Sequence, residues 1–100
     1  MQGWYEKAEP LFQRALDITE KSFGENHPYV AASFNNLAAL YYAQKKYSKA
    51  ATMFEQAISI MQKRFPTGHP DIDLYQANYD ELKRSMTATS VSQNIPLNIE

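Results

Sequence analysis

The chain has 100 residues, of which 44% are hydrophobic and 21% charged, so it suits one small folded domain and is too apolar for wholesale disorder. Its 10 basic and 11 acidic side chains nearly cancel, which gives no general attraction for nucleic acid or an anionic membrane. The absence of cysteine excludes disulfides and thiolate metal sites, and it fits a reducing, cytoplasmic location.

The first predicted element is a helix over residues 4–23. Pro10 lies about one and a half turns into it and removes one backbone hydrogen bond. The helix is nevertheless expected to continue, because apolar residues recur at the spacing of one helix face on both sides of the proline. These residues are Tyr5, Ala8, Leu11, Phe12, Ala15, Leu16 and Ile18.

Three further helices are predicted over residues 28–43, 47–65 and 70–86. Each of the loops GENHP and PTGHP supplies a glycine and then a proline at the first helical position. Only Gln44 to Lys46 join the second helix to the third, and so short a link makes the two helices antiparallel neighbours. No apolar run approaches the roughly 20 residues of a membrane span. Residues 87–100, TATSVSQNIPLNIE, show no periodicity and are expected to form a mostly disordered tail.

The chain repeats itself with a period of 42 residues. Twelve aligned positions are identical, whereas average composition would give roughly two or three by chance. A fixed period of this size predicts a stacked-repeat architecture. The identical pairs are Tyr5/Tyr47, Lys7/Lys49, Ala8/Ala50, Phe12/Phe54, Ala15/Ala57, Ile18/Ile60, Lys21/Lys63, Phe23/Phe65, His27/His69, Pro28/Pro70, Asn36/Asn78 and Leu40/Leu82.

The order of large, small and aromatic residues in two successive helices resembles the tetratricopeptide repeat (TPR). The residues that carry this resemblance are Leu37, Ala38, Tyr41, Tyr47, Ala50, Phe54 and Ala57. The usual TPR period is 34 residues. The longer period, the His-Pro before each first helix and the NNLA segment are similar to the kinesin-light-chain type. Over residues 2–86 the resemblance implies an all-α fold in which antiparallel helix pairs stack as a right-handed superhelix, here an α-solenoid fragment of four helices.

The repeat register places the start of the chain in the turn between two helices of one unit. The first helix then lacks a preceding neighbour, and Trp4, Ala8 and Ala15 are expected to lose packing partners, which favours self-association through residues 4–23. At the other end, three apolar positions of helix 28–43 become polar in helix 70–86, which is typical of a terminal capping helix. The changed pairs are Phe34/Gln76, Ala38/Asp80 and Tyr41/Lys83.

The TPR resemblance implies a concave groove lined by the first helix of each unit, and an asparagine there can pair with a peptide backbone. Arg84 is the only basic residue at the groove positions, so a clamp for a terminal carboxylate is not expected. The predicted peptide-binding residues are Asn35, Asn36, Ala39, Tyr42, Leu74, Asn78, Glu81 and Arg84. The alternative is structural: Asn36, Asn78 and especially Asn35 hydrogen-bond a neighbouring helix and fix how the repeats stack.

Other polar residues have plain structural interpretations. His27 and His69 lie one repeat apart in loops that precede helices, so helix capping is preferred over a metal site. Asp71 and Asp73 occupy the first turn of a predicted helix, where negative charge is favourable. No pattern of catalytic or phosphate-binding residues is present, so neither an enzyme nor a cofactor is predicted.

The sequence therefore predicts a non-catalytic module that binds an extended peptide of a partner protein, with no nucleic acid, membrane or metal involved. The alternative is a structural cap that assembles into a homodimer through residues 4–23. A third interpretation, in which the segment regulates a catalytic domain upstream, makes no prediction for the residues of this chain.

Overall fold

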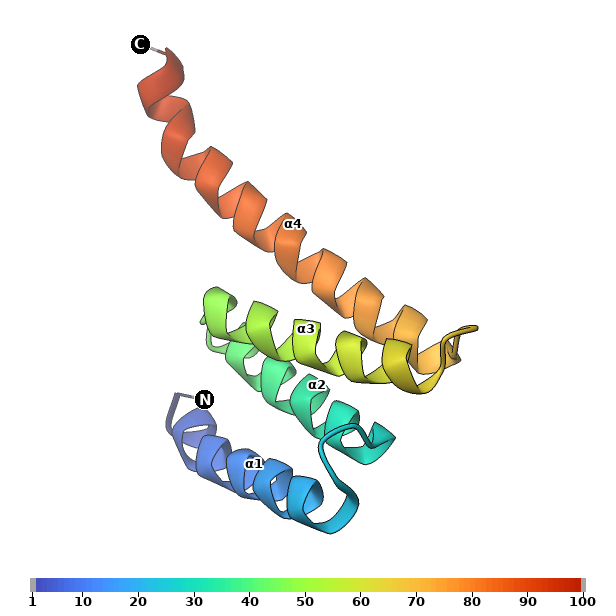
Figure 1. The fold of residues 1–100 in the computed structure, drawn as a ribbon. Coiled ribbons are helices and arrows are strands. Elements are labelled where there is room, and N and C mark those ends of the chain that lie inside the picture. The colour runs from blue at the N-terminus through green and yellow to red at the C-terminus, as the bar shows by residue number, and fades with distance from the viewer. Residues whose placement is uncertain (1, 100) are drawn as a thin grey trace.

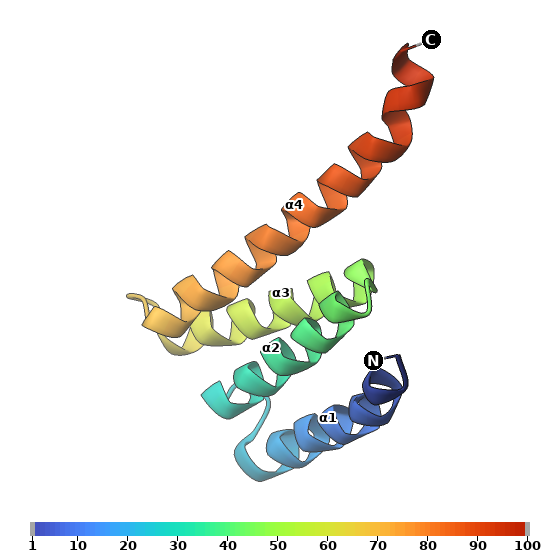
Figure 2. The ribbon, with the colours of Figure 1, turned by 180° about the vertical axis from the view of Figure 1, so that it is seen from behind.

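The computed structural model describes the backbone of residues 2–99 and the side chains of residues 3–87. Within residues 2–99 the chain forms four α-helices and no strand: α1 (Gln2–Phe23), α2 (Pro28–Ala43), α3 (Tyr47–Arg64) and α4 (Pro70–Ile99). The helices stack side by side in chain order, and each runs antiparallel to its neighbour (Figure 1). The reverse view shows the same order (Figure 2). The prediction of an all-α helical repeat fragment is confirmed.

The helix boundaries agree with those predicted except at the end of the chain. We expected the last helix to end near residue 86 and residues 87–100 to form a mostly disordered tail. Instead the helical backbone of α4 continues to Ile99. A segment rich in Ser and Thr has only mediocre helix propensity, but no glycine or proline interrupts it before Pro96, so a helix that is already nucleated can continue through it. Residue 100 lies outside the described residues.

The two histidines cap the first helix of each repeat. The Nδ1 atom of His27 accepts a hydrogen bond from the backbone N–H of Tyr29 at 3.0 Å, and His69 accepts one from the backbone N–H of Asp71 at 2.9 Å. Each bond satisfies an N–H group that has no partner within the helix. The capping role predicted for these loop residues is therefore present in both repeats.

Each capping imidazole also packs against a phenylalanine at the C-terminal end of the preceding helix, the last residue of α1 or the residue directly after α3. The ring centroids are 4.6 Å apart for Phe23 and His27, and 4.5 Å apart for Phe65 and His69. The two loops thus use the same pair of rings one repeat apart, which fixes the angle at which the chain enters α2 and α4.

Replacement of His27 by alanine is expected to lower the free energy of unfolding by about 1 kcal/mol, because the first turn of α2 loses its capping acceptor. Urea denaturation followed by circular dichroism measures the change. His27→Asn supplies another good capping acceptor and serves as the matched control. If the asparagine variant were as unstable as the alanine variant, the ring contact with Phe23, and not the cap, would be the stabilising interaction.

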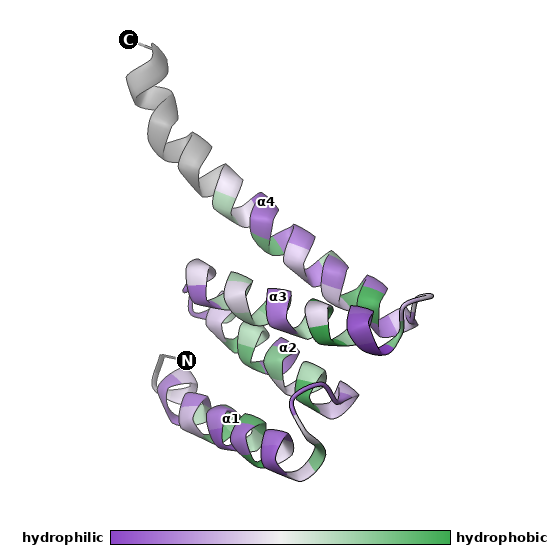
Figure 3. Cartoon of the chain, in the orientation of Figure 1, coloured by the Kyte–Doolittle hydropathy of each residue, from purple (hydrophilic) through white to green (hydrophobic). Residues whose placement is uncertain are grey.

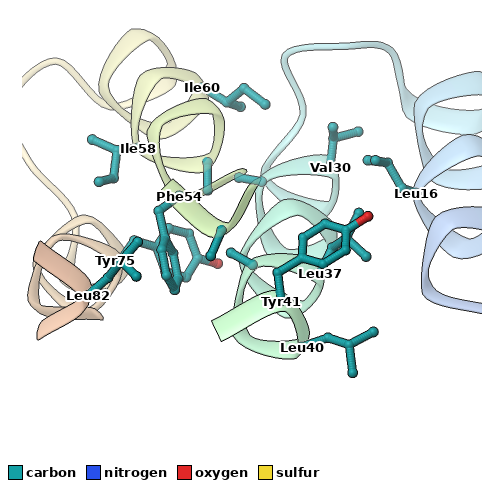
Figure 4. Close-up of a cluster of buried hydrophobic side chains, with 14 of the residues drawn as sticks. Leu16, Val30, Leu37, Leu40, Tyr41, Phe54, Ile58, Ile60, Tyr75 and Leu82 are labelled. Carbon is teal, nitrogen blue, oxygen red and sulfur yellow. The ribbon is translucent and has the colours of Figure 1, made fainter. Parts of the chain in front are cut away.

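The core runs through the interfaces between the four helices. Its largest fully buried side chains come from α2, α3 and α4, and α1 contributes Leu16 (Figure 4). Alanines 38, 50 and 57 are also fully buried, and such small residues allow neighbouring helix backbones to approach closely. The largest fully buried residues are Phe54, Leu37, Met61, Leu82 and Val30.

The exposure of α1 differs in part from the prediction. Trp4 is 56% exposed and Ala15 is also exposed, as the repeat register predicted. The expectation for Ala8 was wrong, since it is only 7% exposed. The adjacent Glu9 accepts a hydrogen bond from the hydroxyl of Tyr41, so the C-terminal turns of α2 lie against this turn of α1 and bury the alanine.

The polar positions of α4 satisfy one another. Gln76 donates to Asp80 at 3.1 Å, and the Nζ atom of Lys83 lies 3.5 Å from Asp80 and 4.5 Å from the ring centroid of Tyr79. The middle of α4 is accordingly hydrophilic in Figure 3. These pairs support the prediction that this face of α4 meets water, because they replace the apolar residues that α2 carries at the equivalent positions.

Candidate functional site

A cavity of about 170 Å³ lies between α2 and α4, with α3 beneath it. Ala39 and Tyr42 contribute from α2, Asn78 and Glu81 from α4, and Phe54 from α3. Four of the eight predicted groove residues therefore meet around one cavity. Because Phe54 is almost completely buried, its ring belongs to the core and also gives the cavity an apolar base.

A side-chain hydrogen bond joins the two helices beside this cavity. The Nδ2 atom of Asn78 donates to Oδ1 of Asn35 at 3.2 Å, and both residues are partly buried. The bond agrees with the structural interpretation of Asn35, since it ties α2 to α4. It uses one donor of Asn78 and leaves its carbonyl oxygen and second N–H, together with the two N–H groups of Asn35.

Two further polar pairs border the cavity. The hydroxyls of Tyr42 and Ser85 lie 2.7 Å apart and form a second link between α2 and α4. Glu81 accepts from Nη2 of Arg84 at 2.9 Å and from its Nε at 3.1 Å. The carboxylate at the cavity is therefore partly neutralised by the arginine one turn later, and an exposed pair of this kind contributes little to stability.

The remaining predicted residues lie elsewhere. Asn36 is exposed and lines a different, wider cavity of about 480 Å³ between α1 and α2, which also includes Ala39. Leu74 is 53% exposed and is outside both cavities, whereas Arg84 reaches the site only through Glu81. Asn36 and Asn78 therefore occupy the same repeat position but border two separate spaces. The other residues that line the wider cavity are Trp4, Tyr5, Phe12, Leu40 and Ala43.

The sequence did not indicate two residues at this site, Phe54 in the cavity lining and Ser85 beside it. Phe54 is part of the TPR pattern, but its position at the base of the cavity depends on how α3 lies under α2 and α4. Ser85 gave no signal, because it aligns with Ala43 and its hydroxyl becomes significant only when Tyr42 faces it.

Three tyrosines have a pKa raised above the ordinary value, so their hydroxyl groups stay protonated. Burial raises the pKa of Tyr41 above its ordinary value, and the negative charge of Glu9 raises it further. Burial likewise raises the pKa of Tyr75, whereas the hydrogen bond to Glu55 is the main cause of the raised pKa of Tyr79. These phenols thus remain neutral donors, and they do not point to acid–base chemistry.

Within the part of the chain that the structure describes, no helix is long and apolar enough to cross a membrane. In the same residues, no group of three or more His, Asp or Glu side chains is arranged to hold a metal ion.

The cavities and hydrogen bonds described above lie within a stack of paired helices. A search of curated proteins found none that matches the chain. A family model described as tetratricopeptide repeat matches residues 1–63, which cover α1, α2 and nearly all of α3. The chain therefore belongs to the tetratricopeptide repeat family.

Proposed function

We propose that this chain is a non-catalytic interaction module that holds an extended peptide of a partner protein against α2 and α4. TPR units in general mediate contacts between proteins. The observation that carries the proposal is the cavity at the α2–α4 junction, where apolar and amide side chains meet. An apolar recess with a few polar groups is the usual composition of a binding site.

The asparagine pair gives the peptide backbone its contacts in this proposal. With Asn78 bonded to Asn35, three N–H groups of the two amides and the carbonyl oxygen of Asn78 are left for a ligand. An extended strand presents alternating N–H and C=O groups, so it can pair with both kinds of atom. One ligand side chain enters between Ala39 and Tyr42 and rests on the Phe54 ring.

The charges around the cavity favour a ligand without strong net charge. Glu81 and Arg84 neutralise each other, so neither a polyacidic nor a polybasic peptide gains a large advantage. A lysine-rich clamp for a terminal carboxylate is not proposed. We also assign the chain to the kinesin-light-chain type of repeat, on the basis of its 42-residue period and its paired His-Pro loops.

The alternative function is self-assembly through the open face of α1. The large apolar residues Trp4, Leu11 and Ile18 are more than half exposed there, which favours this alternative. The exposed side chains of Lys7, Arg14 and Lys21 border the same face, and their like charges oppose the close pairing of two identical copies.

The proposed groove is tested by a peptide-display selection on the purified chain, followed by titration of one enriched synthetic peptide. Asn78→Ala is expected to weaken its binding at least about tenfold, because it removes one direct contact and the bond that orients Asn35. Isothermal titration calorimetry measures the dissociation constants.

The matched control is Asn36→Ala, which changes the same residue one repeat earlier but outside this cavity. It is expected to change the affinity less than about threefold. Equal losses in the two variants, or enriched peptides that bind Asn78→Ala as well as the parent, would rule out the α2–α4 site.

A further inference from the structure

The two capping histidines differ in the side chain that lies beside each of them. In both repeats the Nδ1 atom accepts a hydrogen bond from the backbone N–H two residues later, which belongs to Tyr29 in α2 and to Asp71 in α4. Asp71 also brings a carboxylate, whose Oδ2 atom lies 3.9 Å from Nδ1 of His69. The repeat position of Asp71 is occupied by Tyr29 beside His27, so the two caps share the backbone bond but not the neighbouring charge.

The observed bond fixes the place of the imidazole proton. A ring nitrogen that accepts a hydrogen bond carries no proton, so each neutral histidine has its N–H on Nε2. A second proton has to enter at Nδ1, where it turns the acceptor into a donor that faces another donor, the backbone N–H. The cap therefore exists only while the imidazole is neutral.

The helix that follows each histidine also determines how well a positive charge is tolerated. The first turn of a helix has unpaired N–H groups and the positive end of the helix macrodipole. The first turn of α2 contains no acidic residue, whereas that of α4 contains Asp71 and Asp73. A protonated His27 thus lies at an uncompensated helix end, and a protonated His69 does not.

The rings around His27 do not replace the missing carboxylate. The ring centroids of Phe23 and Tyr29 lie 4.6 and 4.7 Å from that of His27. A ring face attracts a cation only weakly at an exposed position, and it does not accept the Nδ1 proton as a carboxylate does. Among residues 3–87, His27 forms no ion pair with an acidic side chain.

The charged residues of the neighbouring elements balance one another around the loop before α2. Glu20 of α1 and Glu25 of the loop line one recess with Lys63 of α3, and an adjoining recess with Lys21 of α1. Two acidic and two basic side chains therefore surround this joint. Glu25, Lys21 and Lys63 are exposed, so water and salt screen their effect on the imidazole.

His69, by contrast, has a partner for its second proton. After a small rotation its Nδ1–H can donate to the carboxylate of Asp71, so the ring exchanges the backbone N–H for an ionic hydrogen bond and stays in place. The two basic residues in the last turn of α3, Lys63 and Arg64, are exposed and are balanced by Asp71 and Asp73.

We propose that His27 makes the joint between α1 and α2 sensitive to acid: protonation of its imidazole breaks the cap and releases the first turn of α2, while Asp71 preserves the equivalent joint between α3 and α4. Val30 and Ala31 follow the cap directly and are completely buried, so the release loosens part of the core. Stability falls as the pH falls, because the unfolded chain takes up a proton that the neutral cap excludes. His27 does not line the cavity between α2 and α4, so this inference is independent of the proposed groove.

The test compares urea denaturation at about pH 7.5 and at about pH 5.5, a range in which histidine is the one side chain that ordinarily changes its charge. The chain contains two histidines. Between these pH values the equilibrium constant for unfolding of the parent is expected to rise about fivefold more than that of His27→Asn, whose cap does not titrate. His69→Asn is the matched control and is expected to keep the pH dependence of the parent.

An exchange of the two neighbouring residues tests the cause. Tyr29→Asp places a carboxylate beside His27 and is expected to remove most of the pH dependence of the parent. Asp71→Asn is expected to add a second loss of about the same size at the lower pH, because His69 keeps its backbone bond but no longer has the carboxylate. Tyr29 is 59% exposed and the side chain of Asp71 is 50% exposed, so the fold accommodates both changes.

Hydrogen exchange of the unmodified chain keeps the proposal testable even if a variant does not fold. The amides of Val30 and Ala31 donate to the carbonyl oxygen of His27 at 2.9 and 3.2 Å, and the amide of Ile72 donates to that of His69 at 2.9 Å. At the lower pH the first two are expected to lose about fivefold in protection, after correction for the intrinsic exchange rate, whereas Ile72 keeps its protection.

Two results would overturn the proposal. If the parent and His27→Asn had the same pH dependence, the imidazole of residue 27 would not be the acid-sensitive group. If the amide of Ile72 lost as much protection as those of Val30 and Ala31, the carboxylate of Asp71 would not preserve the second joint.

Discussion

Phe54→Ala is expected to lower the free energy of unfolding by about 3–5 kcal/mol, the usual cost of truncating a fully buried phenylalanine. The ring is 1% exposed and lies in α3 where α2 and α4 meet. Its removal leaves a void that three helices cannot close without losing their other contacts. Since small domains are stable by only about 5–15 kcal/mol, this one change removes a large share of the total.

The chain offers its own control for this experiment in Phe12, which occupies the same repeat position in α1 but is partly exposed. Phe12→Ala should cost clearly less, about 1–2 kcal/mol, because part of the ring already meets water. Urea denaturation followed at 222 nm gives both values. Similar losses at residues 12 and 54 would mean that a further helix covers α1 in solution.

Ala57→Glu is the second change with a large expected effect, a loss of about 3–5 kcal/mol. Ala57 is completely buried in α3, and the face it belongs to meets α2. A carboxylate at this position has no partner, and an unpaired buried charge is strongly destabilising. The longer side chain also forces α2 and α3 apart at a point where only a methyl group fits.

The same substitution one repeat earlier, Ala15→Glu, is expected to change the stability by no more than about 0.5 kcal/mol, as is usual at exposed positions. Thermal unfolding of the two variants under identical conditions makes the comparison. A large loss at residue 15 would contradict the exposed face of α1.

The features that depend on the helical spacing of apolar residues or on the 42-residue repeat were predictable from the sequence. The helices of the repeat, their antiparallel order and the capping histidines could be predicted because each depends on residues close in the chain or one repeat apart. The His27 and His69 caps illustrate this, since each bond spans two residues. Ala50 and Ala57 could be assigned to the core because their places in the repeat are fixed by the same period.

The features that depend on the relative placement of helices were not predictable. A hydrogen bond from Asn35 to a neighbouring helix was one of the two predictions for this residue, but its partner Asn78, 43 positions away, was not identified. The contact between the hydroxyls of Tyr42 and Ser85 spans the same distance in the sequence. Both require the exact rotation of α4 against α2, which no local pattern specifies. The burial of Ala8 was missed for a similar reason, because it results from the turns of α2 that place Tyr41 beside Glu9.

The position of Ala39 has a consequence for how this molecule would respond to two ligands. Its methyl group lines both the cavity at α4 and the cavity at α1, so α2 is the common wall of two sites that face different neighbours. A displacement of α2 that widens one space narrows the other, which couples occupancy of the two sites with a negative sign. Two partners that fill these cavities would then compete for this chain, although Ala39 is the one residue that the two linings share.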